Sequence, residues 1–241
     1  MKIENSTILI TGANRGIGRS LVISALERGA EKIYATARNI KSLDQIIALD
    51  PQKIIPIGLD ITNRNQVSDV ANIASDVNIL INNAGILAAG SIIDDSLEMV
   101  IRDMDTNYFG TLNMIRSFVP NLKNNSESAI ANVLSIVSLS NMPAIAGYSA
   151  SKSAAFSMTQ AIRSELAKNN ISVHSVYPGP VDTDMAKDFE MDKASPDDVA
   201  KNILDGIENG DDDIFPDQMS AQCHQMWESN PKDLEKQFGT M

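Results

Sequence analysis

Residues 11–18 read Thr-Gly-Ala-Asn-Arg-Gly-Ile-Gly and join an apolar run, Thr7–Thr11, to a stretch of helical period, Ile17–Arg28. Glycines at such a turn let the backbone approach a pyrophosphate, whose charge the N–H groups and dipole at the helix N-terminus stabilise. Turns also collect glycine for steric reasons, so these glycines alone are weak evidence. Their place in the first β–α unit favours nucleotide binding. The Gly-Lys-Ser/Thr ending of a P-loop is missing, which argues against NTP hydrolysis.

Short β-branched runs alternate with stretches of helical period along the chain, as in repeated βαβ units. Six strands are expected, each rich in Ile, Val or Leu, at Thr7–Thr11, Lys32–Ala37, Lys53–Leu59, Asn78–Asn82, Ala129–Leu134 and Ser172–Tyr177. Helices are expected at Ile17–Arg28, Ile40–Leu49, Arg64–Ala74, Leu97–Leu122, Tyr148–Asn169 and Pro196–Glu208. The pattern predicts an α/β fold with a doubly wound parallel sheet, a Rossmann fold, with helices on both faces.

Length and composition favour one domain. The chain has 241 residues, of which 43% are hydrophobic and 21% charged, and no Pro/Gly/Ser-rich linker divides it. We therefore expect residues 1–241 to form a single domain. Residues 181–194 follow Pro178-Gly179-Pro180 and show no clear period, so they are expected to form a mobile lid over a site. The run Asp211-Asp212-Asp213 is interpreted as a solvated turn, because it lacks the spacing of a calcium loop.

The net charge of −11 is concentrated in residues 182–217, which hold 13 acidic and 3 basic side chains. No segment supplies a concentrated basic surface, so neither nucleic acid nor an acidic membrane is expected as a partner. One cysteine, Cys223, and two histidines, His174 and His224, are too few for a zinc cluster, and no metal site is expected. Neither a signal h-region nor a bilayer-spanning run is found, which makes a cytoplasmic protein the default expectation.

Further motifs follow the glycine-rich turn in a fixed order. They are Asp60 after the third strand, Asn82-Asn83-Ala84-Gly85 at the end of the fourth, Asn107 in the long helix, Ser135 after the fifth strand, Tyr148-Ser149-Ala150-Ser151-Lys152 at a helix start, and Pro178-Gly179 with Thr183 after the sixth strand. Together with the TGxxxGxG pattern of residues 11–18, these motifs resemble the short-chain dehydrogenase/reductase family. The resemblance extends from about Thr7 to Met185.

Tyr148 and Lys152 lie four residues apart, so they share one face of a helix. The free pKa of tyrosine is about 10, and a nearby ammonium lowers it. An isolated Tyr-x-x-x-Lys is more often an exposed pair, but Ser135 and Asn107 at matching places favour catalysis. The resemblance implies that Tyr148 is the general acid/base and that Ser135 bonds the substrate oxygen. It also implies that Lys152 lowers the pKa of Tyr148 and holds the nicotinamide ribose, while Asn107 anchors a water.

The resemblance implies a nicotinamide cofactor. The expected cofactor contacts are Gly12, Asn14, Arg15, Gly16, Ile17, Gly18, Arg38, Asp60, Ile61, Asn83, Ala84, Gly85, Tyr148, Lys152, Pro178, Gly179, Val181 and Thr183. Where NAD-selective relatives carry Asp after the second strand, this chain has Ala37, followed by Arg38. With Arg15, this predicts NADP(H), although either arginine alone could be a solvated charge. Asp60 has the alternative role of a helix N-cap.

The expected substrate contacts are mostly apolar: Leu87, Ser135, Ile136, Val137, Met142, Tyr148, Pro180, Met185 and Phe189, with Met191 nearby. No Arg or Lys stands out among them to bind an anion, so a hydrophobic ketone or aldehyde is expected. The alternative is that the Met and Phe side chains of the lid only pack against the domain. His174 is expected to be a packed histidine, and His224 and Cys223 to lie in a polar tail without partners.

These observations predict an NADP(H)-dependent carbonyl reductase or alcohol dehydrogenase acting on a small-molecule carbonyl or alcohol. An NADP(H)-binding regulator without turnover is the alternative, and an epimerase or dehydratase is disfavoured by the glycine spacing and Arg38. Many relatives end in a seventh strand and a Gly-rich tail, whereas residues 210–241 are expected to be an atypical C-terminal segment. A homo-oligomer is expected, either a homotetramer, which the atypical end makes doubtful, or a homodimer through helices Leu97–Leu122 and Tyr148–Asn169.

Overall fold

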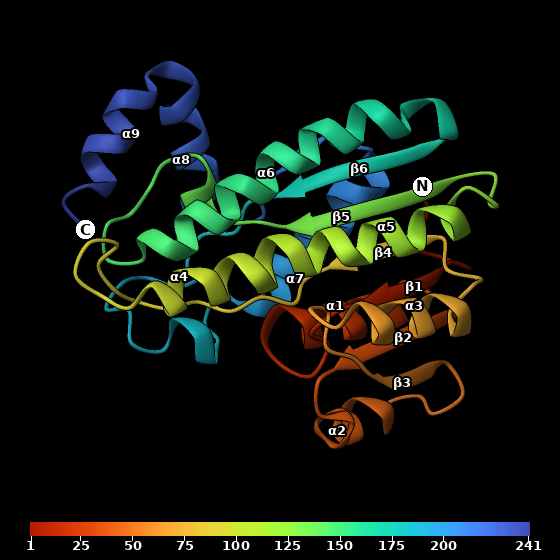
Figure 1. The fold of residues 1–241 in the computed structure, drawn as a ribbon. Helices are drawn as coiled ribbons and strands as arrows, with labels where there is room; N and C mark the ends of the chain where they lie inside the picture. The colour runs from red at the N-terminus through yellow and green to blue at the C-terminus, as the bar shows by residue number, and fades with distance from the viewer.

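Seven strands form one fully parallel sheet in the order β3-β2-β1-β4-β5-β6-β7 (Figure 1). The computed structural model describes residues 1–241. The strands are β1 (Thr7–Ile10), β2 (Lys32–Ala37), β3 (Ile54–Gly58), β4 (Ile79–Asn82), β5 (Ser128–Val133), β6 (Ile171–Val176) and β7 (Asp213–Ile214). The doubly wound sheet predicted from the sequence is confirmed.

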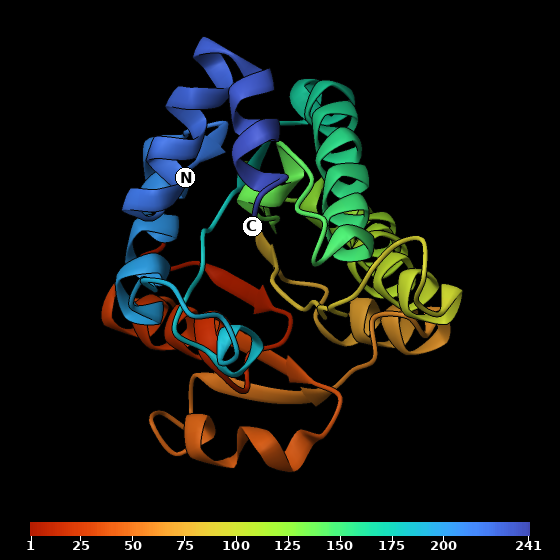
Figure 2. The same ribbon diagram turned by 90° about the vertical axis from the view of Figure 1, so that its left-hand side faces the viewer.

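Helices cover both faces of the sheet, as parallel strands require (Figure 2). On one face lie α1 (Gly16–Glu27), the short α2 (Asp44–Ile47) after η1 (Ile40–Leu43), and α7 (Pro196–Asn209). On the other lie α3 (Arg64–Ile73), α4 (Leu97–Asp103), α5 (Thr111–Leu122) and α6 (Ala146–Leu166). Two buried apolar clusters, of 27 and 22 residues, fill the space between each helix layer and the sheet. None of these helices has both the length and the hydropathy that a membrane span requires.

The strand order reverses at β1, which pairs with β2 on one side and with β4 on the other: Ile8 lies opposite both Ile33 and Ile79. Crossovers from β1 and from β4 therefore leave the sheet in opposite directions. A crevice opens between the loops at the carboxyl ends of these strands, which is the usual ligand site of such sheets.

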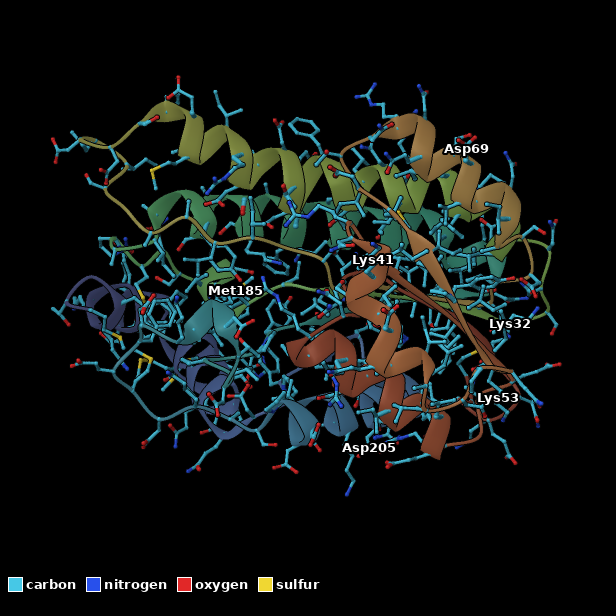
Figure 3. All side chains as sticks on the ribbon, turned by 90° about the horizontal axis from the view of Figure 1, so that it is seen from below. Lys32, Lys41, Lys53, Asp69, Met185 and Asp205 are labelled. Atoms are coloured by element: carbon cyan, nitrogen blue, oxygen red, sulfur yellow. The ribbon has the colours of Figure 1, made fainter.

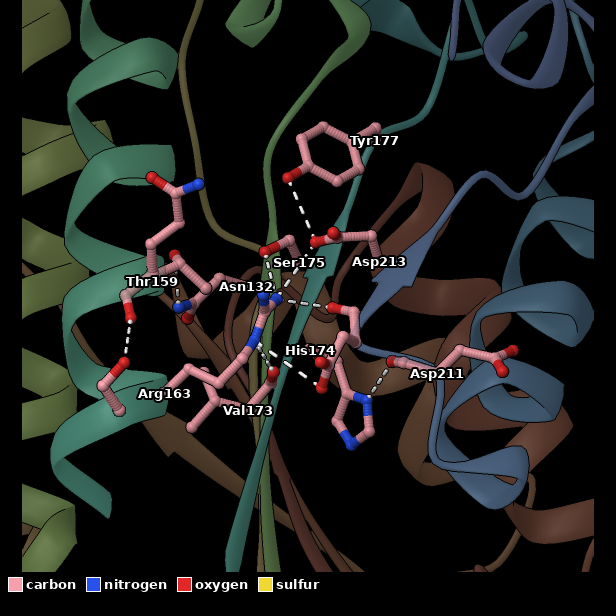
Figure 4. A network of polar contacts seen from close by, with 12 residues as sticks. Asn132, Thr159, Arg163, Val173, His174, Ser175, Tyr177, Asp211 and Asp213 are labelled. Carbon is pink, nitrogen blue, oxygen red and sulfur yellow. Dashed lines mark hydrogen bonds and ion pairs between the residues drawn. The ribbon is translucent and has the colours of Figure 1, made fainter. Parts of the chain in front are cut away.

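The seventh strand corrects the expectation of six strands. Asp213 and Ile214 pair with Ser175 and Val176 of β6, so Asp213 begins a strand and does not end a solvated turn. Arg163 of α6 holds this edge, since its guanidinium donates to the Asp212 carbonyl and to the Asp213 carboxylate (Figure 4). Buried His174 lies beside them, with Nδ1 2.6 Å from the Asp211 carbonyl oxygen, as expected for a packed histidine.

The predicted helix Leu97–Leu122 is continuous but not uniform. Between α4 and α5 lies η2 (Met104–Gly110), a π-helical segment, whose backbone hydrogen bonds join residues five apart where an α-helix joins residues four apart. The predicted helix Tyr148–Asn169 begins two residues early, at Ala146, and ends in η4 (Ala167–Asn169), a 3₁₀ turn. Neither feature has a strong signal in hydrophobic periodicity.

The C-terminal segment folds into two helices, α8 (Gln218–Ser229) and α9 (Pro231–Phe238), on the β6–β7 side of the sheet (Figures 1 and 2). Asp217 caps α8 through the Ser220 N–H, and the Ser220 hydroxyl accepts from the Asp217 N–H. The expectation that Cys223 and His224 lack partners is wrong. Cys223 is buried, and the His224 ring stacks on Phe215 with centroids 3.9 Å apart.

Candidate active site

A cavity of about 760 Å³ lies at the carboxyl ends of the strands. Every residue predicted to contact the cofactor lines it, from Gly12 in the first turn to Thr183 after β6. Figure 3 labels Met185, which lies in the 3₁₀ turn η5 (Asp184–Ala186) and lines the cavity, and Lys41, which lies in η1 beside the cavity-lining Ser42. The site predicted from scattered motifs is thus a single concave surface.

The glycine-rich turn needs glycine at defined positions. Gly12 and Gly16 have φ of +66° and +51°, in the left-handed region that other residues rarely adopt. A Cβ on Gly18 would lie 2.1 Å from the Gly12 carbonyl oxygen, so only glycine lets α1 start this close to the turn. Gly16, Ile17 and Gly18, the first three residues of α1, line the cavity, so the N-terminus of this helix borders it.

The end of β4 is tied to the end of β1. The Asn83 amide donates to the carbonyl oxygens of Thr11 and Gly12, at 2.9 and 3.2 Å. In return, the Thr11 hydroxyl accepts from the N–H groups of Asn83 and Ala84. These bonds fix the two turns that border the crevice at the strand-order reversal.

No acidic residue occupies the end of β2. Ala37 is buried there, and Arg38 follows it on the cavity wall without an ion pair. Arg15 also lines the cavity, and its guanidinium lies 2.7 Å from Asp184, with both side chains largely exposed. The Asp60 carboxylate accepts from the N–H and hydroxyl of Thr62. Since Asn63 is the N-cap of α3, the alternative that Asp60 is a helix cap is wrong.

Tyr148 and Lys152 lie in the first two turns of α6 and Ser135 lies directly after β5, and all three line the cavity. The Lys152 Nζ is 5.7 Å from the centre of the Tyr148 ring and donates to the Val133 carbonyl oxygen at 2.7 Å. The Ser135 hydroxyl accepts weakly from the Val137 N–H, 3.4 Å away. The phenol, the ammonium and the hydroxyl are thus brought together as predicted.

Burial dominates the ionisation of this pair. It raises the pKa of Tyr148 far above its usual value, although the Ser135 hydroxyl opposes the shift. Burial also lowers the pKa of Lys152, to about 8. In the protein alone, the lysine therefore does not bring the tyrosine near neutrality. At pH 7 Tyr148 is a phenol, the form that donates a proton.

Asn107 lies behind the cavity wall and does not line it. Its amide donates to the Ile86 carbonyl oxygen and to the Ser151 hydroxyl, and its carbonyl accepts from the Ile86 N–H at 2.9 Å. A Cβ on Gly85 would lie 3.1 Å from the Asn107 Oδ1 and 3.5 Å from the Lys152 Nζ. The π-helical turn therefore presents Asn107 to the loop after β4 and to the surroundings of Lys152.

All residues predicted for the substrate wall line the cavity, as does Met191. The cavity also includes residues that the sequence analysis missed: Thr36, Asn39, Ser42, Leu59, Thr62, Ile86, Arg102, Asp105, Thr106, Val133, Leu134, Ile145, Asp184 and Ala186. Most of them follow a strand and could have been found from that position alone. Arg102, Asp105 and Thr106 share the i, i+3, i+4 spacing of one helix face. Arg102 is a basic residue of the cavity lining that the sequence analysis did not name.

The segment 181–194 closes on itself at its base. Val181 and Ala194 form a parallel bridge, and the N–H groups of Asp182 and Ala194 donate to Ala194 and Pro180 carbonyl oxygens. Between these ends, Met185, Phe189 and Met191 face the cavity. The side chains of this segment therefore do more than pack against the sheet layer.

Comparisons with known proteins agree with this geometry. A family model for the short chain dehydrogenases matches residues 6–194. A crystal structure of a short chain dehydrogenase from Burkholderia cenocepacia, in complex with NADP, is 38% identical, with a TM-score of 0.93 over 99% of each chain. One from Burkholderia phymatum, in complex with NAD, is 21% identical and shares the fold, with a TM-score of 0.86 over 98% of this chain and 96% of that one. An uncharacterized oxidoreductase of Staphylococcus aureus is 31% identical over 212 residues, which are 84% of this chain and 90% of the relative.

Proposed function

This chain belongs to the short-chain dehydrogenase family, and on that premise we propose that it is an NADP(H)-dependent oxidoreductase acting on a hydrophobic ketone or aldehyde, or on the matching alcohol. One observation carries the proposal: Tyr148, Ser135 and Lys152 line the same cavity as the glycine-rich turn. A regulator that only binds the dinucleotide has no need of a buried phenol beside an ammonium. The proposed activity uses both the glycine-rich turn and the group of Tyr148, Ser135 and Lys152.

The residues present fit a dinucleotide. A Cβ at Gly12 would come within 3.0 Å of the Ala84 Cα, so glycine there lets the turn after β1 pack directly against the turn after β4, and both turns line the cavity. Gly16, Ile17 and Gly18 place helix N–H groups toward a pyrophosphate, and Asp60 with Ile61 borders the adenine side. When bound, the nicotinamide supplies or accepts the hydride.

Side chains of this protein transfer the proton and stabilise the negative charge that develops on the substrate oxygen. The Ser135 hydroxyl donates a hydrogen bond to the substrate oxygen, and Tyr148 donates its phenolic proton to that oxygen as negative charge develops on it. The Lys152 ammonium stabilises the phenolate that remains. In the oxidative direction the same groups act in reverse, and Tyr148 takes the proton. Asn107 holds the loop after β4 in place beside Lys152.

The preference for NADP(H) is supported by the charges at the end of β2. A ribose 2′-phosphate would meet Arg38 and no carboxylate at the end of that strand, where an acid would favour a free 2′-hydroxyl. Arg15 of the first turn would add a second contact by exchanging its exposed ion pair with Asp184 for the phosphate. The 38% identical structure was solved with NADP. We expect kcat/KM to be at least about tenfold higher with NADPH than with NADH. A preference for NADH would contradict this part of the proposal.

The substrate class is supported by the apolar side chains that face the Tyr148 side of the cavity. Leu87, Val137, Met142, Met185 and Phe189 suit an aryl or alkyl group. The test is NADPH absorbance decay with neutral aryl ketones, alkyl ketones, aldehydes and 2-keto acids. Faster turnover of the keto acids would instead point to Arg102 as an anion contact.

Tyr148→Phe separates an enzyme from a binding protein. We expect the variant to lose about 10²–10⁴-fold in kcat, because the proton donor is gone while the ring still packs. Binding of NADPH, followed by its fluorescence, is expected to stay within about twofold. Unchanged turnover in the variant would sink the assigned acid role.

A homodimer is proposed for the helix layer that carries α4 and α5. Leu97, Ile101 and Phe109 are large apolar side chains with 66%, 48% and 45% of their surface exposed. Leu97 and Ile101 lie one turn apart on α4 and Phe109 lies in the adjoining η2, and contiguous exposed apolar surface marks protein–protein contacts. Light scattering after size exclusion is expected to give twice the mass of 26.1 kDa, and Ile101→Glu is expected to yield monomer.

A further inference from the structure

Asp103, the last residue of α4, is a carboxylic acid with none of its surface exposed. Both of its carboxylate oxygens accept from the Ala88 N–H, at 3.2 and 3.3 Å. An asparagine would satisfy that single N–H equally well. Burying a charge is costly, so a carboxylate at this position calls for a role that an amide could not fill.

The Asp103 carboxylate lies at the N-terminus of α6, the helix that carries Tyr148, the proton donor proposed above. A Cβ on Gly147 would be 3.6 Å from the Asp103 Oδ2, and it would lie only 3.2 Å from Val100. Gly147 thus lets α4 approach the first turn of α6 closely. That turn has no acidic residue and no side-chain cap of its own. Asp103 supplies from another helix the negative charge that a helix N-terminus favours.

The charged groups around Asp103 come from three elements. Arg102 is its neighbour on α4, and Asp95 of the preceding loop borders the same small cavity. From α6, Tyr148 and Lys152 are close enough for the charge of Asp103 to act on their ionisation. Burial raises the pKa of Asp103, whereas the Ala88 N–H, Arg102 and Lys152 favour its charged form. Its charge in turn raises the pKa of Lys152 against the effect of burial, and it raises the pKa of Tyr148 as well.

We propose that Asp103 is a positioning residue of the active site: from the N-terminus of α6 it fixes the turn that carries Tyr148, and its carboxylate supplies a negative charge that favours the Lys152 ammonium. The catalytic meaning of the inference rests on the function proposed above. Its electrostatic part concerns the protein alone. The two parts can therefore be tested separately.

The electrostatic part is tested without substrate or cofactor. Protein labelled with ¹³C at lysine Cε is titrated by NMR, and the Lys152 signal is assigned by its loss in Lys152→Arg. The wild-type midpoint is expected near 8. Asp103→Asn keeps an acceptor for Ala88 but removes the charge, so the midpoint is expected to fall by about half a pH unit or more.

Glu98→Gln is the matched control, because it removes an exposed carboxylate from the same helix. Its Lys152 midpoint is expected to stay at the wild-type value. Should Asp103→Asn fail to fold, Asp103→Ser removes the same charge and leaves a smaller acceptor. A Lys152 midpoint that is unchanged in a folded Asp103 variant would overturn the proposal.

The catalytic part is tested with the best ketone of the substrate panel. In Asp103→Asn, the pH at which kcat/KM for reduction falls on the alkaline side is expected to move downward, because Tyr148 loses its proton more readily. The profile for alcohol oxidation is expected to move downward as well, because the same Tyr148 oxygen accepts the proton in that direction. A fixed profile with a shifted Lys152 midpoint would refute the catalytic part alone. Absence of turnover with every ketone would count against the proposed function and leave the NMR result standing.

Discussion

Lys152 has an ammonium group in a place that disfavours charge. Its side chain is 5% exposed, and burial moves its pKa from 10.5 to about 8. Between these two values the unfolded chain binds more protons than the folded one, so the free energy of unfolding rises with pH across this window. Below pH 8 both states are protonated, and the folded state bears the full cost of about 3 kcal/mol.

Lys152→Met is therefore expected to raise the free energy of unfolding at pH 7 by about 1–2 kcal/mol, after allowing for the lost bond to Val133. Near pH 10 the gain is expected to shrink, because the wild-type lysine is then neutral. Urea unfolding of the wild type and the variant at pH 7 and at pH 10 measures the gain in stability and its decrease. Turnover should be lost in the same variant, and a destabilised protein at pH 7 would contradict the argument.

Arg38 is the residue on which the coenzyme preference depends most directly. Removing one charge-assisted contact to a 2′-phosphate costs about 1.5–3 kcal/mol, so Arg38→Ala is expected to weaken NADPH binding about tenfold or more and to leave NADH binding unchanged. Lys41→Ala, in the next turn of chain and outside the cavity, is the control and should change neither. Equal losses for the two coenzymes would argue against a 2′-phosphate contact.

Single residues were predictable where a motif places them. Tyr148, Lys152, Ser135 and the glycines lie where the sequence predicted. Asp103 was missed, because an acid inside an amphipathic helix reads as a solvent-facing residue. Its burial depends on how α4 packs against α6, and no local pattern specifies that.

Among the secondary-structure elements, hydrophobic periodicity predicted the longer strands and helices and missed the short ones. The six longer strands and the main helices were found from apolar runs. β7 has only two residues, and its pairing depends on Arg163, which is distant in sequence. The π-helical turn holds Asn107, whose partners Ile86 and Ser151 are distant in sequence, so the periodicity of the helix itself does not predict these contacts.

Two glycines test how the first turn and its helix depend on close packing. Gly18→Ala would place a Cβ 2.1 Å from the Gly12 carbonyl oxygen, so we expect loss of NADPH binding and a drop of several kcal/mol in stability. Gly58→Ala adds the same methyl group at the end of β3, where the nearest atom is 4.0 Å away, and should be nearly neutral. Calorimetry of both variants measures the contrast. Normal NADPH binding by Gly18→Ala would show that the turn adapts.

At the scale of the whole molecule, the C-terminal helices support the substrate side of the cavity from behind. Leu234 and Phe238 of α9 belong to a buried cluster with Ile136, Val137 and Tyr148. No residue of α8 or α9 lines the cavity itself. The last part of the chain therefore contributes to the site through packing.

Phe238→Ala is expected to lower the free energy of unfolding by about 3–5 kcal/mol, as for other buried aromatic residues. Because the same cluster packs against Tyr148, KM for the best ketone is expected to rise while NADPH affinity stays the same. Met241→Ala removes an exposed apolar side chain and is the control. If KM were unchanged in a destabilised Phe238→Ala, the cluster would serve stability only.

The ring stack beside this cluster gives the molecule a built-in optical probe. Tyr177, Phe215, His224 and Trp227 follow one another with ring centroids 4.8, 3.9 and 6.4 Å apart, and Trp227 is the chain's single tryptophan. The fluorescence of Trp227 therefore reports on a single site, the face of α8 that packs against Phe215. Detachment of the C-terminal helices would shift that emission to the red. Bound NADPH absorbs in the same range, so energy transfer from this one indole would also reveal an occupied cavity.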